Sequence, residues 1–412
     1  MKGVIRYPRF SIAVSVLVAG IFLLTRCIQP ATDKTGTALS SEYLRFAGSE
    51  TCISCHKNIY DTHIHTAHYL TSRPADKKYI MGNFDSGRNI FSFDPETVVA
   101  MEKRGNHYYQ VEYIKGVQKL ARRFDIVTGS GTKGQTYLNW GDDHLYQLPI
   151  TYFSSAAQWS NSPGYPGRPV FNRPITSRCL ECHSTYVQKI SAPGAEPEDF
   201  DSRQMIYGVD CEKCHGPAAR HVEFQKQNPK ETTGRYIINP ASLSRQQNLD
   251  LCRLCHGGRL SKTTASFAFQ PGDTLSNYFT LDTAVKDADN IDVHGNQYGL
   301  MVASKCFRMS RMTCNTCHNT HENEAGKIEL FSQRCISCHS SGHEPVCRLT
   351  RKIGPSINLN CIDCHMPVKP SRAIEVFLQG NDSPTPAKMR SHYIRIYPDE
   401  TKKFLASLHD IK

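Results

Sequence analysis

Residues 314–321 read Cys-Asn-Thr-Cys-His-Asn-Thr-His, and their first five positions, Cys-x-x-Cys-His, form a pattern that occurs seven times in the 412-residue chain. This spacing is typical of haem c attachment, in which two thiols form thioethers with the porphyrin and the histidine binds the iron. A zinc half-site or a thiol redox pair also uses Cys-x-x-Cys, but neither needs the histidine that follows all seven pairs. We therefore expect seven covalently bound haem c groups, at motifs numbered one to seven along the chain. The motifs are Cys52/Cys55/His56, Cys179/Cys182/His183, Cys211/Cys214/His215, Cys252/Cys255/His256, Cys314/Cys317/His318, Cys335/Cys338/His339 and Cys361/Cys364/His365.

The motifs use 14 of the 17 cysteines and leave Cys27, Cys306 and Cys347. Haem c is attached in an exported, otherwise oxidising compartment, so an export signal is expected. Residues 1–26 match one, because a basic start precedes an apolar run over 12–24. A membrane-spanning helix needs about 20 residues, so this shorter run favours a signal-peptide core. In that compartment, Cys306 and Cys347 either form a disulfide or stay as two thiols.

Cys27 stands where the lipobox of a bacterial lipoprotein has its acylated cysteine. Lipidation would anchor the protein to a membrane, with residues 27–45 as a flexible tether. Arg26 departs from the small residue of a lipobox, so an uncleaved anchor and ordinary cleavage remain as alternatives. We expect an exported lipoprotein of a Gram-negative bacterium, in the periplasm or at the outer membrane.

The formal net charge of +11 does not indicate a nucleic-acid partner. The expected signal holds four basic residues and no acid, which leaves +7 for the mature chain. Each haem with two histidine ligands contributes about −1 when ferric and about −2 when ferrous, because both propionates are ionised. The loaded protein is then nearly neutral when oxidised. We expect no nucleic acid as a partner, and much of the Lys and Arg excess should pair with propionates.

Uneven motif spacing divides the chain. The first two motifs are separated by 122 residues, whereas the last six occupy 187. Within the long gap, residues 107–114 carry the β-branched and aromatic residues of a strand and are bounded by glycines. We expect a first-haem segment over 46–178, a six-haem domain over 179–412, and a structural β-rich insertion at about 85–160 packed on the first haem.

Short spacers predict closely packed haems. Only 16 residues separate motifs five and six, and 21 separate motifs six and seven. Such segments are too short to bury one haem each, so neighbouring porphyrins must share a core. With only 39% hydrophobic residues, the chain needs the haem faces themselves as apolar core. The predicted fold class is mainly α with much irregular structure, a multihaem cytochrome c architecture with an inserted antiparallel β unit after the first haem.

Eleven histidines lie outside the motifs, enough to give every iron a second axial ligand. Two histidine ligands close the iron to substrates and suit electron transfer, whereas a missing distal ligand leaves an open iron. The candidate distal ligands are His68, His221, His321 and His343, which follow a motif closely, and His294, His392 and His144. The others, expected at the surface or beside propionates, are His63, His65, His107 and His409.

His321 comes three residues after His318, too close for the two rings to bind opposite faces of one porphyrin. His321 is therefore expected to reach the iron of a neighbouring haem, which would tie adjacent haems into one unit. The same reasoning applies to His221 after motif three and to His343 after motif six.

Four blocks of sequence resemble a known family, the multihaem cytochromes related to the tetrahaem electron carriers of ammonia oxidisers. The blocks are residues 46–56 with Thr66-Ala-His68, residues 210–217 with Arg220-His221, residues 304–321, and residues 361–367 with Arg390-Ser-His392. The resemblance spans most of the mature chain and implies that His68, His221, His321 and His392 are distal ligands. This chain departs from the family at His63, where relatives often carry Trp, and in having seven motifs.

The function that we favour is a heptahaem electron carrier between a membrane quinol-oxidising system and an acceptor, exchanging electrons with redox partner proteins. Ample distal histidines support it, and it needs no catalytic residue. The alternative is an enzyme that reduces a small nitrogen or sulfur species at one open iron. A third hypothesis is a haem subunit of a larger complex or polymer. Some relatives are reductases and others only pass electrons, so whether the protein is an enzyme stays open.

Replacing Cys27 by Ser tests the lipid anchor. Without the thiol there is no acylation, so the variant is expected in the soluble fraction, while the wild type stays with membranes. Fractionation followed by in-gel haem staining measures the distribution. Unchanged membrane retention of the variant would favour an uncleaved helix.

Overall fold

The computed structural model describes residues 39–281, 295–340, 347–381 and 383–409. Contacts divide the chain into two units, Met1–Leu44 and Arg45–Lys412, and the second unit holds all seven motifs. The expected signal peptide, Cys27 and most of the tether lie outside the described residues, as do His294 and His343. Among the helices that are described, none has the length and apolar character needed to cross a bilayer.

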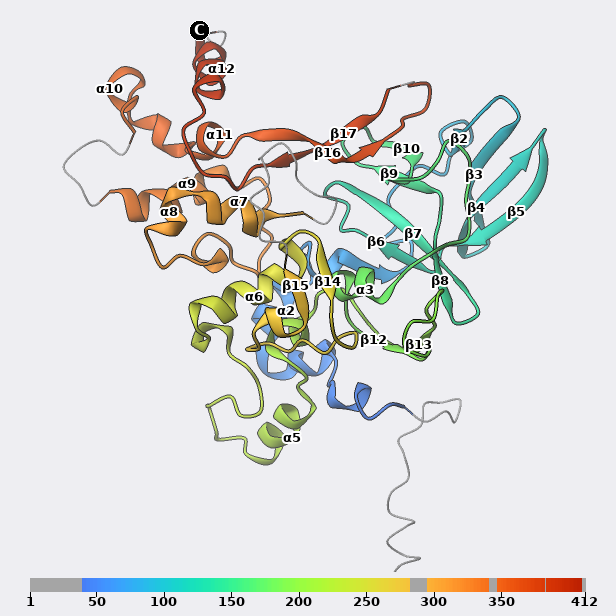
Figure 1. Ribbon diagram of the computed structural model, residues 1–412, viewed down its shortest axis with the longest axis horizontal. Coiled ribbons are helices and arrows are strands. Elements are labelled where there is room, and N and C mark those ends of the chain that lie inside the picture. The colour runs from blue at the N-terminus through green and yellow to red at the C-terminus, as the bar shows by residue number, and fades with distance from the viewer. Residues whose placement is uncertain (1–38, 282–294, 341–346, 382, 410–412) are drawn as a thin grey trace, which may run out of the picture. The chain divides into compact units, whose positions relative to one another are not determined.

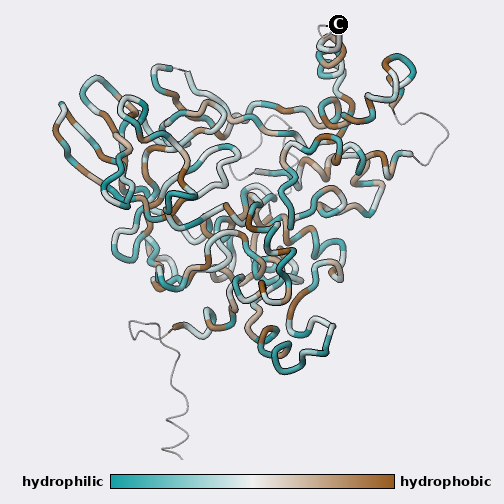
Figure 2. Tube along the Cα trace, turned by 180° about the vertical axis from the view of Figure 1, so that it is seen from behind, coloured by the Kyte–Doolittle hydropathy of each residue, from teal (hydrophilic) through white to brown (hydrophobic). Residues whose placement is uncertain are grey.

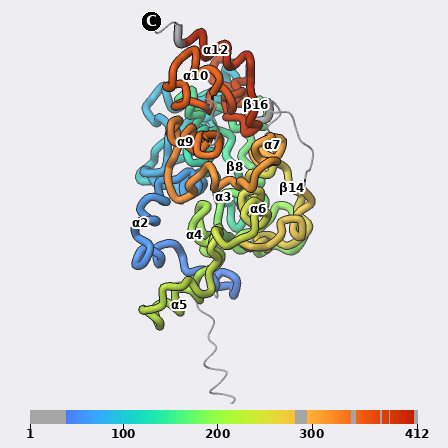
Figure 3. The backbone as a smooth tube through the Cα atoms, turned by 90° about the vertical axis from the view of Figure 1, so that its left-hand side faces the viewer, coloured from blue at the N-terminus to red at the C-terminus, as the bar shows by residue number. Residues whose placement is uncertain are grey.

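The helices are short, and most of them carry a motif at one end (Figures 1 and 3). The α-helices are α2 (Ile53–His63), α3 (Ser177–His183), α4 (Cys211–His215), α5 (Ala219–Gln227), α6 (Arg245–His256), α7 (Gln297–Ala303), α8 (Lys305–Arg308), α9 (Ile328–His339), α10 (Thr350–Ile353), α11 (Ile362–His365) and α12 (Pro398–His409). The 3₁₀ turns are η1 (Tyr43–Arg45), η2 (Ser49–Cys52), η3 (Tyr69–Thr71), η4 (Pro240–Ser242), η5 (Leu275–Asn277), η6 (Cys314–Thr316) and η7 (Pro355–Leu359). Helices α3, α4, α6, α9 and α11 each end on a motif histidine, which fixes where that imidazole leaves the backbone.

Two antiparallel sheets fill the long gap between motifs one and two (Figure 1). The four-stranded sheet has the order β2 (Ile90–Ser92), β3 (Thr97–Arg104), β4 (His107–Ile114) and β5 (Val117–Arg123). The seven-stranded sheet contains β1 (Ser72–Pro74), β6 (Ile126–Thr128), β7 (Gly134–Gly141), β8 (His144–Gln147), β9 (Ile150–Phe153), β10 (Gln158–Asn161) and β11 (Arg173–Pro174). We call β1 to β11 the β unit. The strand predicted over residues 107–114 is β4.

Side chains of the central strands point alternately to the two faces of the sheet, and the β unit therefore has two cores. On β7, Tyr137 lies in a core with Phe91, Val99, Tyr108 and Trp159, between the two sheets. The next residue, Leu138, points into a second core with Ile126, Phe200 and Leu180. Figure 2 shows hydrophobic residues along the whole chain and not in a single segment.

The second core shows one surface on which the β unit packs. Leu180 in this core belongs to α3, which carries motif two, and packing of the β unit on the first haem stays a prediction. The hydroxyl of Ser72 on β1 also donates to the backbone carbonyl of His183. The sheet therefore supports the second attachment segment directly. The long spacing between motifs one and two shows where the insertion begins. It does not show which later segment packs on the second face of the sheet.

Three two-stranded hairpins complete the strands: β12 (Ser184–Lys189) with β13 (Phe200–Tyr207), β14 (Leu260–Lys262) with β15 (Phe279–Leu281), and β16 (Val368–Val376) with β17 (Thr385–Arg390). Helix makes up 31% and strand 26%, so the expectation of a mainly α fold is not supported. The expected inserted antiparallel strands are present. The hairpins add strand outside the region in which strands were expected. The domain boundaries remain a prediction.

Ile150 on β9 is fully buried in the first core of the β unit. Ile150→Ala should lower the free energy of unfolding of this unit by about 2–5 kcal/mol, because it leaves a cavity. Urea unfolding followed by the fluorescence of Trp140 and Trp159, both in the β unit, measures the change.

The matched control is Val117→Ala on β5, where the side chain is 57% exposed. It should change stability by less than about 0.5 kcal/mol. Equal effects of the two substitutions would contradict the core assignment.

Candidate haem-binding sites

Three motif histidines each face a histidine from a distant segment. The ring centres are 6.2 Å apart for His68 and His256, 6.2 Å for His392 and His318, and 6.1 Å for His321 and His215. Each pair joins a non-motif histidine to a different motif from the one it follows in sequence. His321 thus lies beside motif three, the position that ligation of a neighbouring haem requires.

These separations fit two imidazoles on one metal. A metal–imidazole bond of about 2.0 Å, with about 1.1 Å more from nitrogen to ring centre, places two opposed rings about 6.2 Å apart. A direct hydrogen bond between two imidazoles would bring the ring centres to about 5 Å, which is closer than any of the three pairs. The spacing therefore leaves room for an iron between the rings.

In two motif histidines, a backbone carbonyl holds Nδ1. Nδ1 of His215 lies 2.8 Å from the carbonyl oxygen of Ile238, and Nδ1 of His365 lies 3.0 Å from the carbonyl oxygen of Arg395. A carbonyl only accepts, so Nδ1 carries the proton and Nε2 offers its lone pair. This is the usual arrangement of a metal-binding histidine, whose second nitrogen is fixed by a protein group.

His221 shows the same arrangement, with Nδ1 2.8 Å from the carbonyl oxygen of Arg235. In His183 of motif two, Nδ1 lies 3.0 Å from the hydroxyl oxygen of Thr71. Both rings are therefore oriented by backbone or hydroxyl groups from another segment.

Burial keeps the facing imidazoles neutral. It lowers the pKa of His68 and of His392 to about 4, and it also lowers the pKa of His256 and His318. A neutral imidazole has the lone pair that a metal bond needs, whereas an imidazolium does not. At neutral pH these rings need no deprotonation to bind iron.

Thiols of different motifs meet in pairs. A hydrogen bond with Cys52 of motif one raises the pKa of Cys211 of motif three, and one with Cys314 of motif five raises the pKa of Cys252 of motif four. A hydrogen bond with Cys182 of motif two likewise raises the pKa of Cys255 of motif four. Because each thiol marks the edge of a porphyrin, attached haems at these motifs would meet edge to edge.

Three motif thiols are exposed to solvent. Cys55 of motif one, Cys179 of motif two and Cys338 of motif six are exposed, whereas the other motif cysteines are buried or partly buried. Cys55 and Cys338 lie on the helices α2 and α9, on the side that the neighbouring chain does not cover. Burial depends on which distant segment covers a helix face, which the spacing of the motifs does not encode. Attachment at these cysteines remains a prediction, with haem edges that face solvent.

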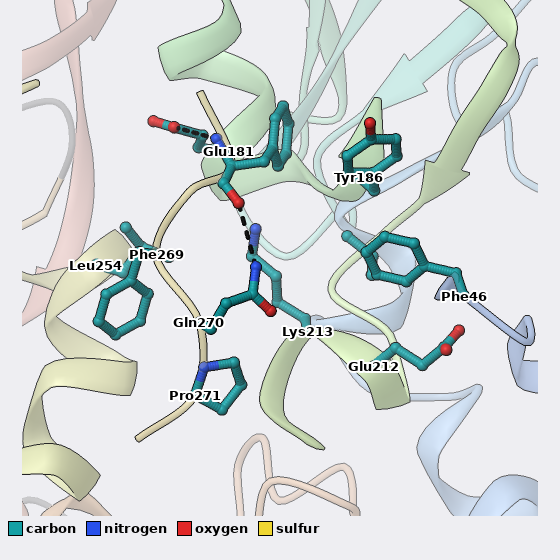
Figure 4. A pocket seen from close by; sticks show the side chains of 11 residues that line it. Phe46, Glu181, Tyr186, Glu212, Lys213, Leu254, Phe269, Gln270 and Pro271 are labelled. Carbon is teal, nitrogen blue, oxygen red and sulfur yellow. Dashed lines mark hydrogen bonds between the residues drawn. The ribbon is translucent and has the colours of Figure 1, made fainter. Parts of the chain in front are cut away.

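Motifs two, three and four also converge on one small pocket (Figure 4). Their middle residues Glu181, Glu212, Lys213 and Leu254 line it, together with the aromatic rings of Phe46, Tyr186, Phe267 and Phe269. Glu181 accepts a 2.9 Å hydrogen bond from the backbone N–H of Phe267. These middle residues thus meet one another, apart from the iron-binding histidines.

Glu212 fastens the start of the haem region to motif three. Its buried carboxylate accepts hydrogen bonds from the backbone N–H groups of Ala47, Gly48 and Ala218, at 2.8, 2.9 and 2.7 Å. Gly208 allows a second close approach, because a Cβ there would lie 2.3 Å from the carbonyl oxygen of Tyr69. The turn that contains His68 is thereby held against motif three.

Motifs five, six and seven are joined by polar contacts. Arg334 on α9, one residue before motif six, forms a bidentate pair with the buried carboxylate of Glu324 at 2.5 and 2.9 Å. The same guanidinium donates to the carbonyl of Cys317 in motif five, at 2.8 Å. Ser332, also on α9, accepts from the backbone N–H of Cys361 in motif seven, at 2.9 Å.

The remaining predicted residues have other surroundings. Nδ1 of His144 on β8 lies 2.6 Å from Asp199, and its ring lies 5.9 Å from Tyr146. The carboxylate beside Nδ1 orients this ring, as backbone carbonyls orient His215 and His365, and ligation by His144 stays a prediction. Cys306 and Cys347 are both free thiols, so the structure contains no disulfide between them.

His63 is a histidine whose position the sequence did not indicate. We expected a surface or propionate role, but it is buried, with Nε2 3.6 Å from Asp210 and its ring 6.3 Å from His321. It follows His56 by seven residues, the spacing of two helical turns, although the backbone of His56 itself departs from helical geometry. That period was the available signal.

Apolar side chains stand exposed beside several motifs. Ile59 follows motif one, Leu359 precedes motif seven and Val368 follows it, each at least 45% exposed. A porphyrin face is a large apolar surface, and attachment there would cover such side chains. This distribution, together with the ring spacing, fits haem.

Comparisons with known proteins agree with this chemistry. Residues 167–216, which include motifs two and three, match the family model described as cytochrome c554 and c-prime. The multiheme cytochrome MtrA of Shewanella baltica (strain OS185) is 23% identical over 183 residues, 40% of this chain. The match spans about half of the relative, 53% of its length.

The crystal structure of the outer cell wall cytochrome OcwA resembles this chain in fold. The TM-score is 0.54 at 17% identity, over 87% of this chain and 81% of that chain. Taken together, the family match, the relative and the shared fold support a multihaem c-type cytochrome.

The pairing of His68 with His256 predicts which haem loses a ligand in each variant. His68→Ala should remove one low-spin haem, and adding His256→Ala should remove no further one if both rings bind the same iron. Adding His56→Ala instead should remove a second. Integrated electron paramagnetic resonance of the oxidised protein counts the low-spin haems.

The His318→Ala and His321→Ala pair is the matched control, since the two residues are three positions apart in sequence but face different histidines, His392 and His215. Together they should remove two low-spin haems. If His68→Ala combined with His256→Ala removed two, the pairing would be wrong.

Proposed function

We propose that this protein is an exported heptahaem c-type cytochrome that passes electrons along closely spaced, mostly bis-histidine haems. The observation that carries the proposal is the set of three facing imidazole pairs, each at the spacing of a shared iron. Haem c supplies one-electron chemistry at every motif. The chain supplies the axial ligands, the fixed orientation and the exclusion of water.

The contacts among the motifs form one connected set. Cys52 of motif one is hydrogen-bonded to Cys211 of motif three, and His215 of motif three faces His321, which follows motif five by three residues. The guanidinium of Arg245 on α6 donates to the carbonyl of Met312, which precedes motif five, at 3.1 Å. Arg334 and Ser332 extend the series to motifs six and seven. Electrons can therefore cross from motif one to motif seven in short steps.

Motif two lies to one side of this series. Arg178 on α3 donates to the carbonyl of Leu254 in motif four at 2.8 Å, and the two helices pack on each other. A haem at motif two would exchange electrons through motif four, and the path between the other motifs would not depend on it.

Covalent attachment and neutral ligands suit this task. The thioethers hold each porphyrin in place through repeated oxidation and reduction. Two buried imidazoles keep the iron six-coordinate, so little rearrangement accompanies electron transfer. Hydrogen bonds to Nδ1, such as that of His215, tune the basicity of the ligand.

The partners and location follow as proposals from the same chemistry. Attachment of haem c requires export, and the likeness to MtrA and to an outer cell wall cytochrome supports a position outside the cytoplasm. A lipid on Cys27 would hold the protein at a membrane, near a quinol-oxidising donor. The acceptor would be a redox protein in the periplasm or at the outer membrane.

Haem content and spin state test the proposal first. The pyridine haemochrome assay should give seven haems per chain, and the electron paramagnetic resonance spectrum should be low-spin throughout. A high-spin component equal to one haem would instead favour reduction of a small nitrogen or sulfur species at an open iron.

Removing single haems tests the path. In a film oriented through a tag at the carboxyl end, the wild type should exchange about seven electrons per molecule in fast protein-film voltammetry, one per haem. Cys314→Ser with Cys317→Ser should reduce this to the two haems at motifs six and seven, because motif five links them to the rest.

Cys179→Ser with Cys182→Ser is the matched control, because it also removes one haem but at the side position. Six haems should then remain addressable. If each variant still exchanged about six electrons per molecule, the path would not run through motif five. A haem count of six in each variant verifies that one haem alone was lost.

A further inference from the structure

The hairpin of β16 and β17 links two distant parts of the second unit (Figure 1). It begins three residues after His365 of motif seven and ends two residues before His392. Its strands pair from Val368 with Arg390 to Val376 with Thr385. The segment that carries His392 is therefore the direct continuation of a strand whose other end lies at the hairpin tip.

The tip of the hairpin docks on the β unit. The backbone N–H of Phe377 donates to Asn161 Oδ1 at 2.6 Å, and Phe377 accepts from the backbone N–H of Asn161 at 3.4 Å. Gln379 accepts from the backbone N–H of Ser92 on β2 at 2.7 Å. Each of these bonds joins residues more than 200 positions apart.

A small core lies under the same contact. Val376 and Ala387, each 1% exposed, pack with Phe153 of β9, and Ile374 and Leu378 cover the edge. The apolar contact and the hydrogen bonds together make the tip a fixed end. The hairpin is thus anchored in the β unit and is not a free arm.

The base of the hairpin is fixed on motif seven. Arg390 donates to the carbonyl of Met366 and to the carboxylate of Asp363, both at 2.8 Å. The backbone N–H of Ser391 donates to the carbonyl of Pro367 at 3.0 Å. The next residue is His392, whose imidazole lies 6.2 Å from His318 of motif five.

We propose that the β unit is a brace that holds His392 on the iron of motif five through this hairpin, and that releasing the hairpin tip opens this iron to a small exogenous ligand. The inference rests on the proposed bis-histidine ligation at motif five. In this arrangement His392, at the base of the hairpin, is the ligand. Asn161 on β10 is a positioning residue, because it binds the tip at the opposite end. The insertion between motifs one and two thereby acts on a haem more than 150 residues away in sequence.

Further contacts hold the turn around His392, among them those of Arg395 with His365 and of Ser304. The hydroxyl of Ser304, fully buried between α7 and α8, donates to the carbonyl of His392 at 3.2 Å and accepts from the backbone N–H of Ile394 at 2.8 Å. This contact keeps the turn near motif five when the tip is released. The ring is then expected to leave and return, and not to be lost.

Carbon monoxide binding to the reduced protein tests the brace. Ferrous iron with two histidines takes up carbon monoxide only when one ring leaves. The double variant Asn161→Ala with Gln379→Ala removes two tip hydrogen bonds, and its rate of uptake at one haem should rise about tenfold over the wild type. His392→Ala is the reference and should bind one equivalent rapidly.

Gln110→Ala is the matched control. Gln110 is a buried amide in the β unit that also bonds to backbone, donating to and accepting from Ile150, but it does not touch the hairpin. It should lower the stability of the β unit without a change in carbon monoxide uptake. Gln379→Ala alone, at an exposed residue, keeps the test valid if the double variant fails to fold, and should show a smaller rise in the same direction.

The outcomes separate the brace from the ligation beneath it. Uptake in the double variant equal to that of the wild type, with rapid binding in His392→Ala, would overturn the brace and leave the ligation intact. Absence of binding in His392→Ala would show that His392 is not a ligand, which would overturn both. Equal rises in the Gln110 and tip variants would attribute the effect to general loosening and overturn the brace.

Discussion

Opposed imidazoles from distant segments, held about 6 Å apart, are the constraint on which the arrangement of this chain depends. Each pair has to be closed by backbone that comes from elsewhere: His68 from the turn after α2, His321 from the loop after motif five, His392 from the end of a hairpin. The polypeptide between motifs therefore runs from one motif to a neighbour's ligand. The short helices and irregular turns follow from that requirement, since a long regular element would overshoot the next ligand.

The sequence was most informative where the signal is local. All seven motifs, the strand over residues 107–114 and the separation of His318 from His321 depend on residues within a few positions of each other. The pairing of His68 with motif four depends on contacts across 188 positions, and no local pattern encodes it. The same limit applies to the face of the β unit that meets Leu180. His63 lay between these cases, because its helical period was readable but its burial depended on Asp210.

Polar contacts account for much of the order between motifs. Glu212 and Glu324 are both buried, and each is satisfied by donors from a different segment. Their removal would leave backbone N–H groups or a guanidinium without an acceptor, which costs more than the bond itself contributes. Only 39% of the residues are hydrophobic, so such contacts and the porphyrins stabilise the fold together, as a large apolar core does in other proteins.

Five helices end on a motif histidine, and this would place the same electrostatic pole beside each iron that these histidines bind. The carboxyl end of a helix carries a partial negative charge from its unpaired carbonyl groups. That charge stabilises ferric over ferrous iron and so lowers the reduction potential. Helices α6 and α9, with twelve residues each, have a fuller dipole than the five-residue α4 or the 3₁₀ turn η6. Motifs four and six would thus be the harder to reduce, which gives the electron path an uneven energy profile set by helix length.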